Sequence, residues 1–398
     1  MHYIKLIQTA NSSMQYKINM SVVFHYIWDN GETYRNEIAS TLGMSLPAVN
    51  RAVIALIDMG FVEISEVRRN VKSRTVPYYR VVIEDVVILT IDYLKGLIGS
   101  FQEGNLVCVQ KLSSLSNFTI EAFTNEISDY VLNKLQRKIT DIKSICIGFP
   151  GIVDEDKGMV ITAIYHRDLE GISIKEVLEK KYNCQVFIDN VVNIAVYANY
   201  CEFNKKYKNI VSFDLGMEMG AGLLINGQTY RGEGFIAGET GFFVHNLEDP
   251  IINYKMTNTF RSLCVDAELK FHGKKLDVLK IEEDYCREIV NDLFVKANQG
   301  DSDCLELIDS YIERIVLMLN KVDVLLNPRI IVLSGDVCQL PNSEHLFLDV
   351  LNKKFNCVRK CKEKVCYSKF GALVTLQGGG ETALENYISK QFPYKMGE

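Results

Sequence analysis

Apolar residues recur at helical spacing near the start of the chain, and turn residues interrupt them. The spacing predicts a first helix over residues 20–28, with inward-facing positions at Val23, Phe24, Ile27 and Trp28. This helix is expected to stop at Asp29-Asn30-Gly31, because these residue types favour turns. A second helix is predicted from about Tyr34 to Leu42, with Thr33 as its N-cap and Gly43 at its end.

A third helix is predicted immediately afterwards, from about Leu46 to Met59. Ser45 is a good N-cap, Pro47 is tolerated in the first helical turn, and Gly60 closes the helix. The predicted buried stripe consists of Val49, Val53, Leu56 and Ile57. Only Gly43, Met44 and Ser45 separate the second and third helices, which is the spacing of a helix-turn-helix whose second helix enters the DNA major groove.

The third helix is expected to expose a face on which an amide, a guanidinium and Ile54 lie together, and these polar groups can contact base edges or phosphates. After Gly60, residues 61–64 and 79–83 flank a basic run and predict a β-hairpin wing near the DNA backbone. A solvated charged loop is the alternative for that run. The candidate DNA-binding residues are Thr33, Arg35, Ser45, Pro47, Ala48, Asn50, Arg51, Arg68, Arg69, Lys72 and Arg74.

The remainder of the chain is predicted to be an α/β body. Strand-like apolar runs alternate with helical stretches, at residues 86–90, 145–148, 186–188, 210–213 and 330–333. These runs end in loops that carry Gly, Asp or Asn, which predicts a ligand pocket at the strand ends, between two lobes. A long helix ending before Pro328 is expected to have a buried stripe of Leu305, Ile308, Ile312, Ile315, Leu319 and Val322.

The distribution of charge supports a boundary between a head and a body. The net charge of the 398 residues is -6, but residues 1–80 carry nine Lys or Arg against six Asp or Glu, and the rest carry 35 against 44. A small basic module on a larger acidic one fits a DNA-binding head on a sensor body, so we place the domains at residues 1–82 and 83–398.

The composition also bears on the compartment. The eleven cysteines are scattered and no secretory leader precedes them, which favours a reducing environment. The most apolar stretch, residues 86–101, is interrupted by Asp92 and Lys95 and is too short to span a bilayer. A core strand followed by a turn explains this stretch better. We therefore expect a cytoplasmic protein with no membrane segment.

Four segments, in their order along the chain, resemble the ROK family of repressors, open reading frames and sugar kinases. They are RNEIASTLGMSLPAVNRAVIALIDMGFVE in the head, and IGFPGIVDEDKGMV, DLGMEMGAGLLINGQTYRGEGFIAGETGF and ANQGDSDCLEL in the body. The resemblance spans nearly the whole chain and implies a winged helix-turn-helix on a body of two actin-like or hexokinase-like lobes, with a sugar between them. For the family's repressors it implies a homodimer or homotetramer that releases operator DNA when an inducer binds.

One departure from the family bears directly on catalysis. In the family's kinases an Asn-Asp pair follows a strand, and its aspartate is the general base that deprotonates the sugar hydroxyl. The corresponding segment FIDNVVNIAVYAN keeps Asn190 but has Val191 in the aspartate's position, and valine cannot accept a proton. Asp189 lies one position earlier on a strand and is expected to point elsewhere.

The segments that would hold nucleotide phosphates in the family's kinases are also altered. Asp92 is kept, but Tyr93 and Leu94 place side chains where glycine would let the backbone approach a phosphate. The glycine-containing segment 216–222 carries Glu218, whose charge would oppose a phosphate. We therefore expect no kinase activity, no catalytic residue and no cofactor.

The family's zinc site is not expected in this chain. Phe242 stands in place of the histidine that joins three cysteines in the family, and His245 has no cysteine close to it in the sequence. The run Cys357, Cys361 and Cys366 fits no common metal-binding pattern and is expected to be structural. Because the missing histidine also contacts the sugar in the family, the remaining candidate sugar-binding residues are Pro150, Gly151, Asn190 and Glu239.

Three functions from different classes remain open at this point. The leading one is a DNA-binding transcription regulator, a repressor of carbohydrate metabolism that responds to a sugar or sugar derivative. The second is a sugar kinase that also carries a DNA-binding head, which Val191 opposes. The third is a regulator whose altered sugar domain serves dimerisation or the binding of a protein partner.

Overall fold

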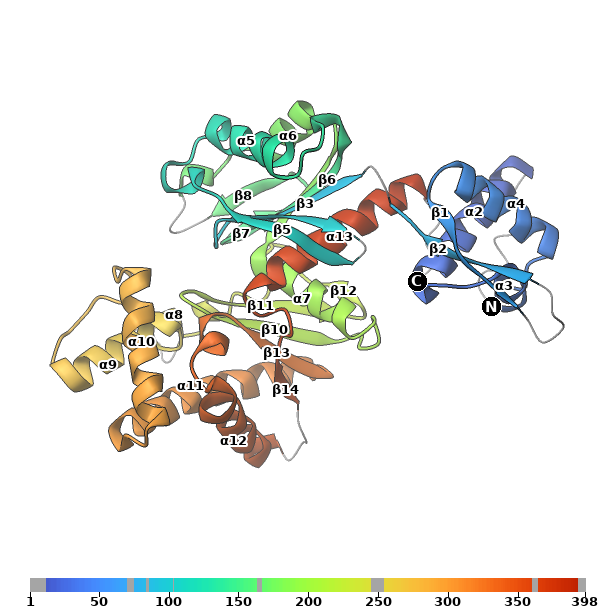
Figure 1. Ribbon diagram of the computed structural model, residues 1–398. Coiled ribbons are helices and arrows are strands. Elements are labelled where there is room, and N and C mark those ends of the chain that lie inside the picture. The colour runs from blue at the N-terminus through green and yellow to red at the C-terminus, as the bar shows by residue number, and fades with distance from the viewer. Residues whose placement is uncertain are drawn as a thin grey trace.

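The computed structural model describes residues 12–69, 75–83, 86–102, 104–162, 167–244, 254–359 and 364–392. They form an N-terminal module of helices and a hairpin, which we call the head, and two α/β lobes (Figure 1). A C-terminal helix, red in Figure 1, runs from between the lobes to the head. Among the described residues, no helix combines the length and the apolar character needed to cross a membrane.

The described part of the head contains three helices and an antiparallel hairpin, in the order in which the sequence predicts them. They are α2 (Ser12–Asn30), α3 (Arg35–Leu42), α4 (Leu46–Asp58), β1 (Val62–Arg69) and β2 (Thr75–Val81). Gly43 ends α3 in the left-handed conformation, at φ 63°, and the Ser45 side chain caps α4 by accepting a hydrogen bond from the backbone of Ala48. The helical pattern thus located both ends of the turn between α3 and α4.

Two details of the head differ from the sequence prediction. α2 begins at Ser12 rather than at residue 20, so the first helix is longer than its apolar stripe. Thr33 is not the N-cap of α3, because Tyr34 occupies that position and makes no side-chain capping bond. Thr33 instead pairs through its backbone with Tyr79 of β2 and is fully buried.

The two lobes contain sheets of the same topology. The first lobe has the strand order β5-β4-β3-β6-β9, and the second has β12-β11-β10-β13-β14. In each sheet the central strand pairs with an antiparallel strand on one side and with a parallel strand on the other. That parallel strand pairs in turn with a second parallel strand at the edge of the sheet. The strands are β3 (Val87–Asp92), β4 (Leu97–Gln102), β5 (Asn105–Lys111), β6 (Ile142–Phe149), β9 (Gln185–Asn190), β10 (Ile210–Leu215), β11 (Met219–Ile225), β12 (Gln228–Thr229), β13 (Ile330–Ser334) and β14 (Val365–Tyr367).

Helices cover the sheets, and a small hairpin extends the first lobe. The first lobe contains α5 (Ile120–Asp129), α6 (Ile174–Tyr182) and the hairpin of β7 (Ile152–Asp154) and β8 (Met159–Thr162). The second lobe contains α8 (Tyr254–Thr257), α9 (Phe260–His272), α10 (Glu283–Asn298), α11 (Ser302–Leu326) and α12 (Asp349–Arg359). The predicted α/β body and its five strands are confirmed.

Two predictions about the body need correction. The apolar stretch 86–101 is a hairpin of two buried strands, β3 and β4, rather than one strand and a turn. Leu305 does not belong to the buried stripe of α11, because 39% of it is exposed, whereas the other five predicted positions are buried. α11 otherwise ends before Pro328 and leads into β13, as predicted.

Helices α7 (Val191–Glu202) and α13 (Val374–Gln391) pack against each other between the lobes, and α13 also lies on β3 and β6. Glycines in α13 make this close packing possible. A Cβ atom on Gly378 would overlap the Ile194 carbonyl oxygen of α7, and one on Gly379 would overlap the Thr90 hydroxyl of β3. Small residues are therefore required where α13 passes between helix and sheet.

The end of α13 enters the core of the head. Phe392, which directly follows the helix, is buried and stacks on Phe24 of α2 with a ring separation of 4.3 Å. It also packs edge to face against Phe61, at 5.0 Å, and its carbonyl accepts a hydrogen bond from Ser21. Head and body therefore share one apolar cluster, which links them through α13.

Candidate functional site

The outer face of α4 is the best-formed candidate surface for DNA. Its inner face, formed by Val49, Val53 and Leu56, is buried in the core of the head. Arg51 is exposed on the outer face, together with Ile54, half of whose surface is accessible. A cationic and an apolar side chain therefore project from α4 next to the turn that follows α3.

Three candidate DNA contacts on the head are less accessible than the sequence predicts. Thr33 is fully buried and its hydroxyl donates to Glu37, so it cannot reach a DNA phosphate in this conformation. The Arg35 guanidinium lies 5.0 Å from the centre of the Tyr79 ring and is half-buried there. The Oδ1 atom of Asn50 is buried and has no hydrogen-bond partner among the described residues, so this amide is only half available for base contacts.

The predicted wing is the β1–β2 hairpin, and Arg68 lies on it. The Arg68 guanidinium stacks on Tyr78 at 4.0 Å and forms ion pairs with Glu32, at 2.9 Å, and with Glu66. Exposed ion pairs of this kind contribute only about 0–1 kcal/mol, so a phosphate could replace the carboxylates. The side chain of Arg69, together with Lys72 and Arg74, lies outside the described residues.

A polar cluster lies where the first lobe meets the second. Asn190 caps α7 by accepting a hydrogen bond from Val192, and its Nδ2 donates to the Gly151 carbonyl at 2.5 Å. The same Nδ2 lies 3.3 Å from the Glu239 carboxylate, which comes from the second lobe. The structure therefore brings together Gly151, Asn190 and Glu239, three of the four predicted sugar-binding residues. The fourth, Pro150, is buried and directly precedes Gly151.

The residues that flank Asn190 are unsuited to proton transfer at this cluster. Val191 is buried, and its side chain lies near the Cα of Gly148. The Asp189 carboxylate points away and accepts two hydrogen bonds from Arg231, at 2.6 and 3.0 Å, and a third from Asn193 at 2.9 Å. The expected orientation of Asp189 is confirmed.

A cavity of about 620 Å³ lies at the ends of the central strands of both sheets. Lys95 lines this cavity. Its ammonium donates to the Ala372 carbonyl at 2.8 Å and lies 4.0 Å from Asp92. Burial and the nearby Asp336 and Asp92 raise the pKa of Asp214 to about 6, although Lys95 opposes this shift. Carboxylates therefore crowd this cavity.

Arg287 is a further cation that lines this cavity, and it already pairs with carboxylates of the protein. Its guanidinium forms ion pairs with Asp336 and Glu283, both at 3.0 Å, and with Asp284 at 3.4 Å. Glu218 also lines the cavity, as its place in the sequence suggested, and so does Leu94. Tyr93 does not, because its side chain is buried among Phe118, Phe123 and Phe149. The prediction that Tyr93 obstructs a phosphate is therefore wrong.

Comparison with known proteins explains this arrangement of two lobes. The model of the ROK family matches residues 100–366, which is more than half of the chain. The chain belongs to the ROK family. The xylose repressor of Caldicellulosiruptor bescii is 22% identical over 87% of this chain and 89% of its own length. The DNA-binding transcriptional dual regulator NagC of Escherichia coli is 24% identical over 83% of this chain and 84% of its own.

Solved ROK structures include both regulators and kinases with this fold. A ROK family transcriptional regulator described as a homologue of the Escherichia coli MLC protein superposes with a TM-score of 0.73 and 16% identity, over 95% of this chain and 98% of its own. A ROK glucokinase from Streptomyces griseus in complex with glucose and AMPPNP superposes with a TM-score of 0.58 and 19% identity, over 75% and 99%. The regulator therefore matches nearly the whole chain, whereas the kinase leaves a quarter of it unmatched.

The ROK metal site is only partly covered by the described residues. Phe242 follows buried Gly241, and half of its own surface is exposed. His245 and Cys361 lie outside the described residues. Among the residues that are described, no group of His, Cys, Asp and Glu side chains is arranged to hold a metal ion.

The sequence pattern did not predict the ion pairs of two arginines in this ROK body. Arg231 pairs with Asp189, and also with Glu155 at 2.7 Å, while Arg287 lines the acidic cavity and pairs with Asp336. Each arginine is at least 40 residues from one of its partners in the sequence, so only the fold reveals the contact. A faint signal existed in the acidic run Asp154-Glu155-Asp156, which needs a cation if it is to be partly buried.

Proposed function

We propose that this chain is a DNA-binding transcriptional repressor whose ROK body responds to a sugar and no longer transfers phosphate. The observation that carries the proposal is the combination of an exposed α4 face, joined to α3 by a three-residue turn, with a body in which Val191 occupies the position of the catalytic base. Helix-turn-helix proteins place the second of two such helices in the major groove. The head is accordingly proposed to be a winged helix-turn-helix formed by residues 1–82.

The expected binding mode follows from the accessible groups. Arg51 would donate to a guanine edge or a phosphate, and Ile54 would contact the methyl group of a thymine. The amides at the start of α4 and the wing residues Arg68, Arg69, Lys72 and Arg74 would add phosphate contacts. The names of the xylose repressor and of NagC support this assignment.

Loss of phosphoryl transfer is supported by two independent features. A kinase needs a base within reach of the sugar hydroxyl, and Val191 offers only methyl groups while Asp189 is held by Arg231. The cavity that a nucleotide would need is lined by Glu218, Asp214 and Asp336, and these carboxylates repel a polyphosphate. A non-enzymatic role therefore fits better than kinase activity.

The sugar response is proposed from the polar cluster between the lobes and from the relatives. Asn190, Glu239 and the Gly151 carbonyl offer an amide, a carboxylate and a backbone acceptor, groups that can bind hydroxyls. Ligand binding that changes the closure of the two lobes would alter the spacing of two heads in a homodimer on a two-fold operator. Such a regulator would act in the cytoplasm, where its operator lies.

The test is a comparison of two arginine variants in binding to a DNA fragment from the regulator's own promoter. Arg51→Ala should weaken binding about tenfold or more, because a specific arginine contact contributes about 1–3 kcal/mol. Arg137→Ala is the matched control, since Arg137 pairs with Asp141 on the first lobe, away from the head. Fluorescence anisotropy measures both variants at one salt concentration. Equal affinity of Arg51→Ala and the wild type would contradict the DNA-binding assignment of α4.

A further inference from the structure

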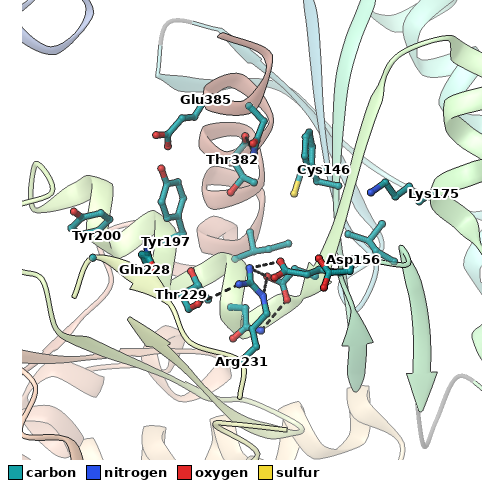
Figure 2. Close-up of a pocket in the computed structure, with 18 of the residues that line it drawn as sticks. Cys146, Asp156, Lys175, Tyr197, Tyr200, Gln228, Thr229, Arg231, Thr382 and Glu385 are labelled. Atoms are coloured by element: carbon teal, nitrogen blue, oxygen red, sulfur yellow. Dashed lines mark hydrogen bonds and ion pairs between the residues drawn. The ribbon is translucent and has the colours of Figure 1, made fainter. Parts of the chain in front are cut away.

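A cavity of about 730 Å³ lies beside α13, between the first lobe and the β12 end of the second. Its walls come from β9, α7, β12 and α13, and from the loop between β7 and β8. Figure 2 shows Thr382 and Glu385 on α13 facing this space, with Arg231 on the opposite side and Tyr197 on α7. We call this cavity the α13 pocket.

The α13 pocket is distinct from the polar cluster that contains Asn190. Successive side chains of a strand point to opposite faces, and Asp189 faces the pocket whereas Asn190 faces Gly151 and Glu239. Among the described residues, the lining of the pocket includes none of these last three. A volume of this size is within the range of about 300–1,000 Å³ that small-molecule sites occupy.

The charges in the α13 pocket already satisfy one another. Arg231 is held by Asp189 and Glu155, and the Lys205 ammonium lies 3.4 Å from the Glu385 carboxylate. Lys175 and Asp156 add one charge of each sign near the rim. A strongly anionic ligand would therefore find no surplus of cations.

The uncharged groups of the pocket call for a ligand that donates hydrogen bonds. Asn193 is only 6% exposed, and its Oδ1 has no hydrogen-bond partner among the described residues, although its Nδ2 donates to Asp189. A buried acceptor without a partner destabilises the protein, and a ligand hydroxyl that donates to it would satisfy it. Thr382, Thr229 and the ring of Tyr197 supply further hydroxyls and an aromatic face. Amides, hydroxyls and aromatic rings beside charges that are already paired suit a small polyhydroxylated molecule.

We propose that the α13 pocket binds a neutral molecule with several hydroxyl groups, of the size of a monosaccharide, and that its occupation acts on the head through α13. The inference rests on the proposed sugar response and adds the α13 pocket to it, as a second hydroxyl-binding site beside the polar cluster around Asn190. The ligand would place a hydroxyl donor on Asn193 Oδ1 and would contact Thr382 on α13.

The location on α13 gives such a ligand a direct route to the head. Six residues separate Asn386, which lines the pocket, from Phe392 in the head core, a rise of about 9 Å along a helix. α13 is clamped at Gly378 and Gly379 between α7 and β3, so a displacement at Thr382 is more readily passed toward the head than toward the clamped end. A ligand that binds one position of α13 better than another would therefore shift the orientation of the head.

The single tryptophan of the chain reports on this route. Trp28 lies in α2, where its ring stacks on Phe24 at 6.2 Å, and Phe24 in turn stacks on Phe392. A change in the position of the Phe392 ring against Phe24 should alter the environment of Trp28. Titration of the full chain with D-xylose, D-glucose and N-acetyl-D-glucosamine, followed by tryptophan fluorescence and by calorimetry, tests both binding and transmission.

Three variants distinguish binding in the α13 pocket from binding at the polar cluster around Asn190. Thr382→Phe fills the α13 pocket from its α13 wall, and Gln228→Ala removes an exposed amide from its β12 wall with little risk to folding. Glu239→Ala alters only the cluster around Asn190. We expect at least one probe to bind the wild type, Thr382→Phe to weaken binding about tenfold or more, Gln228→Ala to weaken it severalfold, and Arg137→Ala, on the first lobe away from both sites, to leave the affinity within about twofold.

The opposite pattern would overturn the inference. If Glu239→Ala abolished binding while Thr382→Phe and Gln228→Ala did not, the effector would sit between the lobes, and the proposed sugar response would stand without the α13 pocket. If none of the three sugars bound the wild type, both the pocket assignment and the sugar response would fail. The promoter-binding assay with Arg51→Ala would then decide by itself whether the chain is still a DNA-binding regulator.

Discussion

Replacing Phe392 by alanine should loosen the head from the body without unfolding the lobes. The Phe392 ring is 1% exposed and packs between Phe24 and Phe61, and both of these belong to the head. Removing a buried phenylalanine side chain costs about 3–5 kcal/mol, of which an aromatic pair accounts for about 0.5–1.5 kcal/mol. Most of this cost should fall on the head, because two head rings lose their partner.

Thermal unfolding followed by Trp28 fluorescence measures this effect, since Trp28 lies in the same cluster. A loss of 1 kcal/mol lowers the midpoint by about 4–8 °C in a domain of 60–100 residues, so the Trp28 transition should fall by at least about 10 °C. The midpoint of the far-ultraviolet circular dichroism signal, which the lobes dominate, should move much less.

A matched control distinguishes this local effect from a general loss of stability. Phe347 is also fully buried but lies in the core of the second lobe, 6.0 Å from Tyr311. Phe347→Ala should therefore lower the circular dichroism midpoint more than the Trp28 midpoint. If Phe392→Ala left the Trp28 transition unchanged, the contact between α13 and the head would not stabilise the head, and the route proposed for the effector would be lost.

Three further predictions concern the body. Gly378→Ala should lower the free energy of unfolding by at least about 1–3 kcal/mol in urea, because its Cβ would overlap the Ile194 carbonyl, whereas Gly234→Ala, with nothing within 4 Å, should change it little. Val191→Asp should not produce ATP turnover with any of the three sugars, because the nucleotide cavity stays acidic; a coupled assay above background would contradict this. Asp214 has a pKa raised from 3.8 to about 6, so the folded state binds the proton more tightly and stability should fall as the pH rises between about 4 and 6; Asp214→Asn should raise the midpoint at pH 7 but little at pH 4, and equal shifts at both would refute the assignment.

The sequence predicted the elements whose signals are local. The strands β3, β6, β10 and β13 are buried on both faces, so they stand out as continuous apolar runs. The turn between α3 and α4 was located because Gly43 and Ser45 act within a few residues of their own position. Asn190 and Glu239 were placed together by the family resemblance, not by their spacing.

Contacts between distant segments were not predictable in this way. Thr33 looks like an N-cap in the sequence, but the strand β2, more than 40 residues later, covers it. Tyr93 stands next to Asp92, yet the aromatic cluster of the first lobe draws its ring into the core. The pairing of Arg231 with Asp189 depends on two lobes folding against each other. In each case tertiary packing decides the role of the residue, and the neighbouring residues in the sequence do not identify its partner.

The position of α13 suggests why a kinase-like body can serve a regulator. In this chain the helix contacts the first-lobe sheet and α7, which packs on β10 and β11 of the second lobe. It also lines a cavity with Thr382, and Phe392 directly after it lies inside the head. A change in the angle between the lobes, or a ligand beside Thr382, would therefore act on one helix that already contacts the head. Neither event needs a nucleotide, so the proposed response does not depend on phosphate binding in the acidic cavity around Asp214.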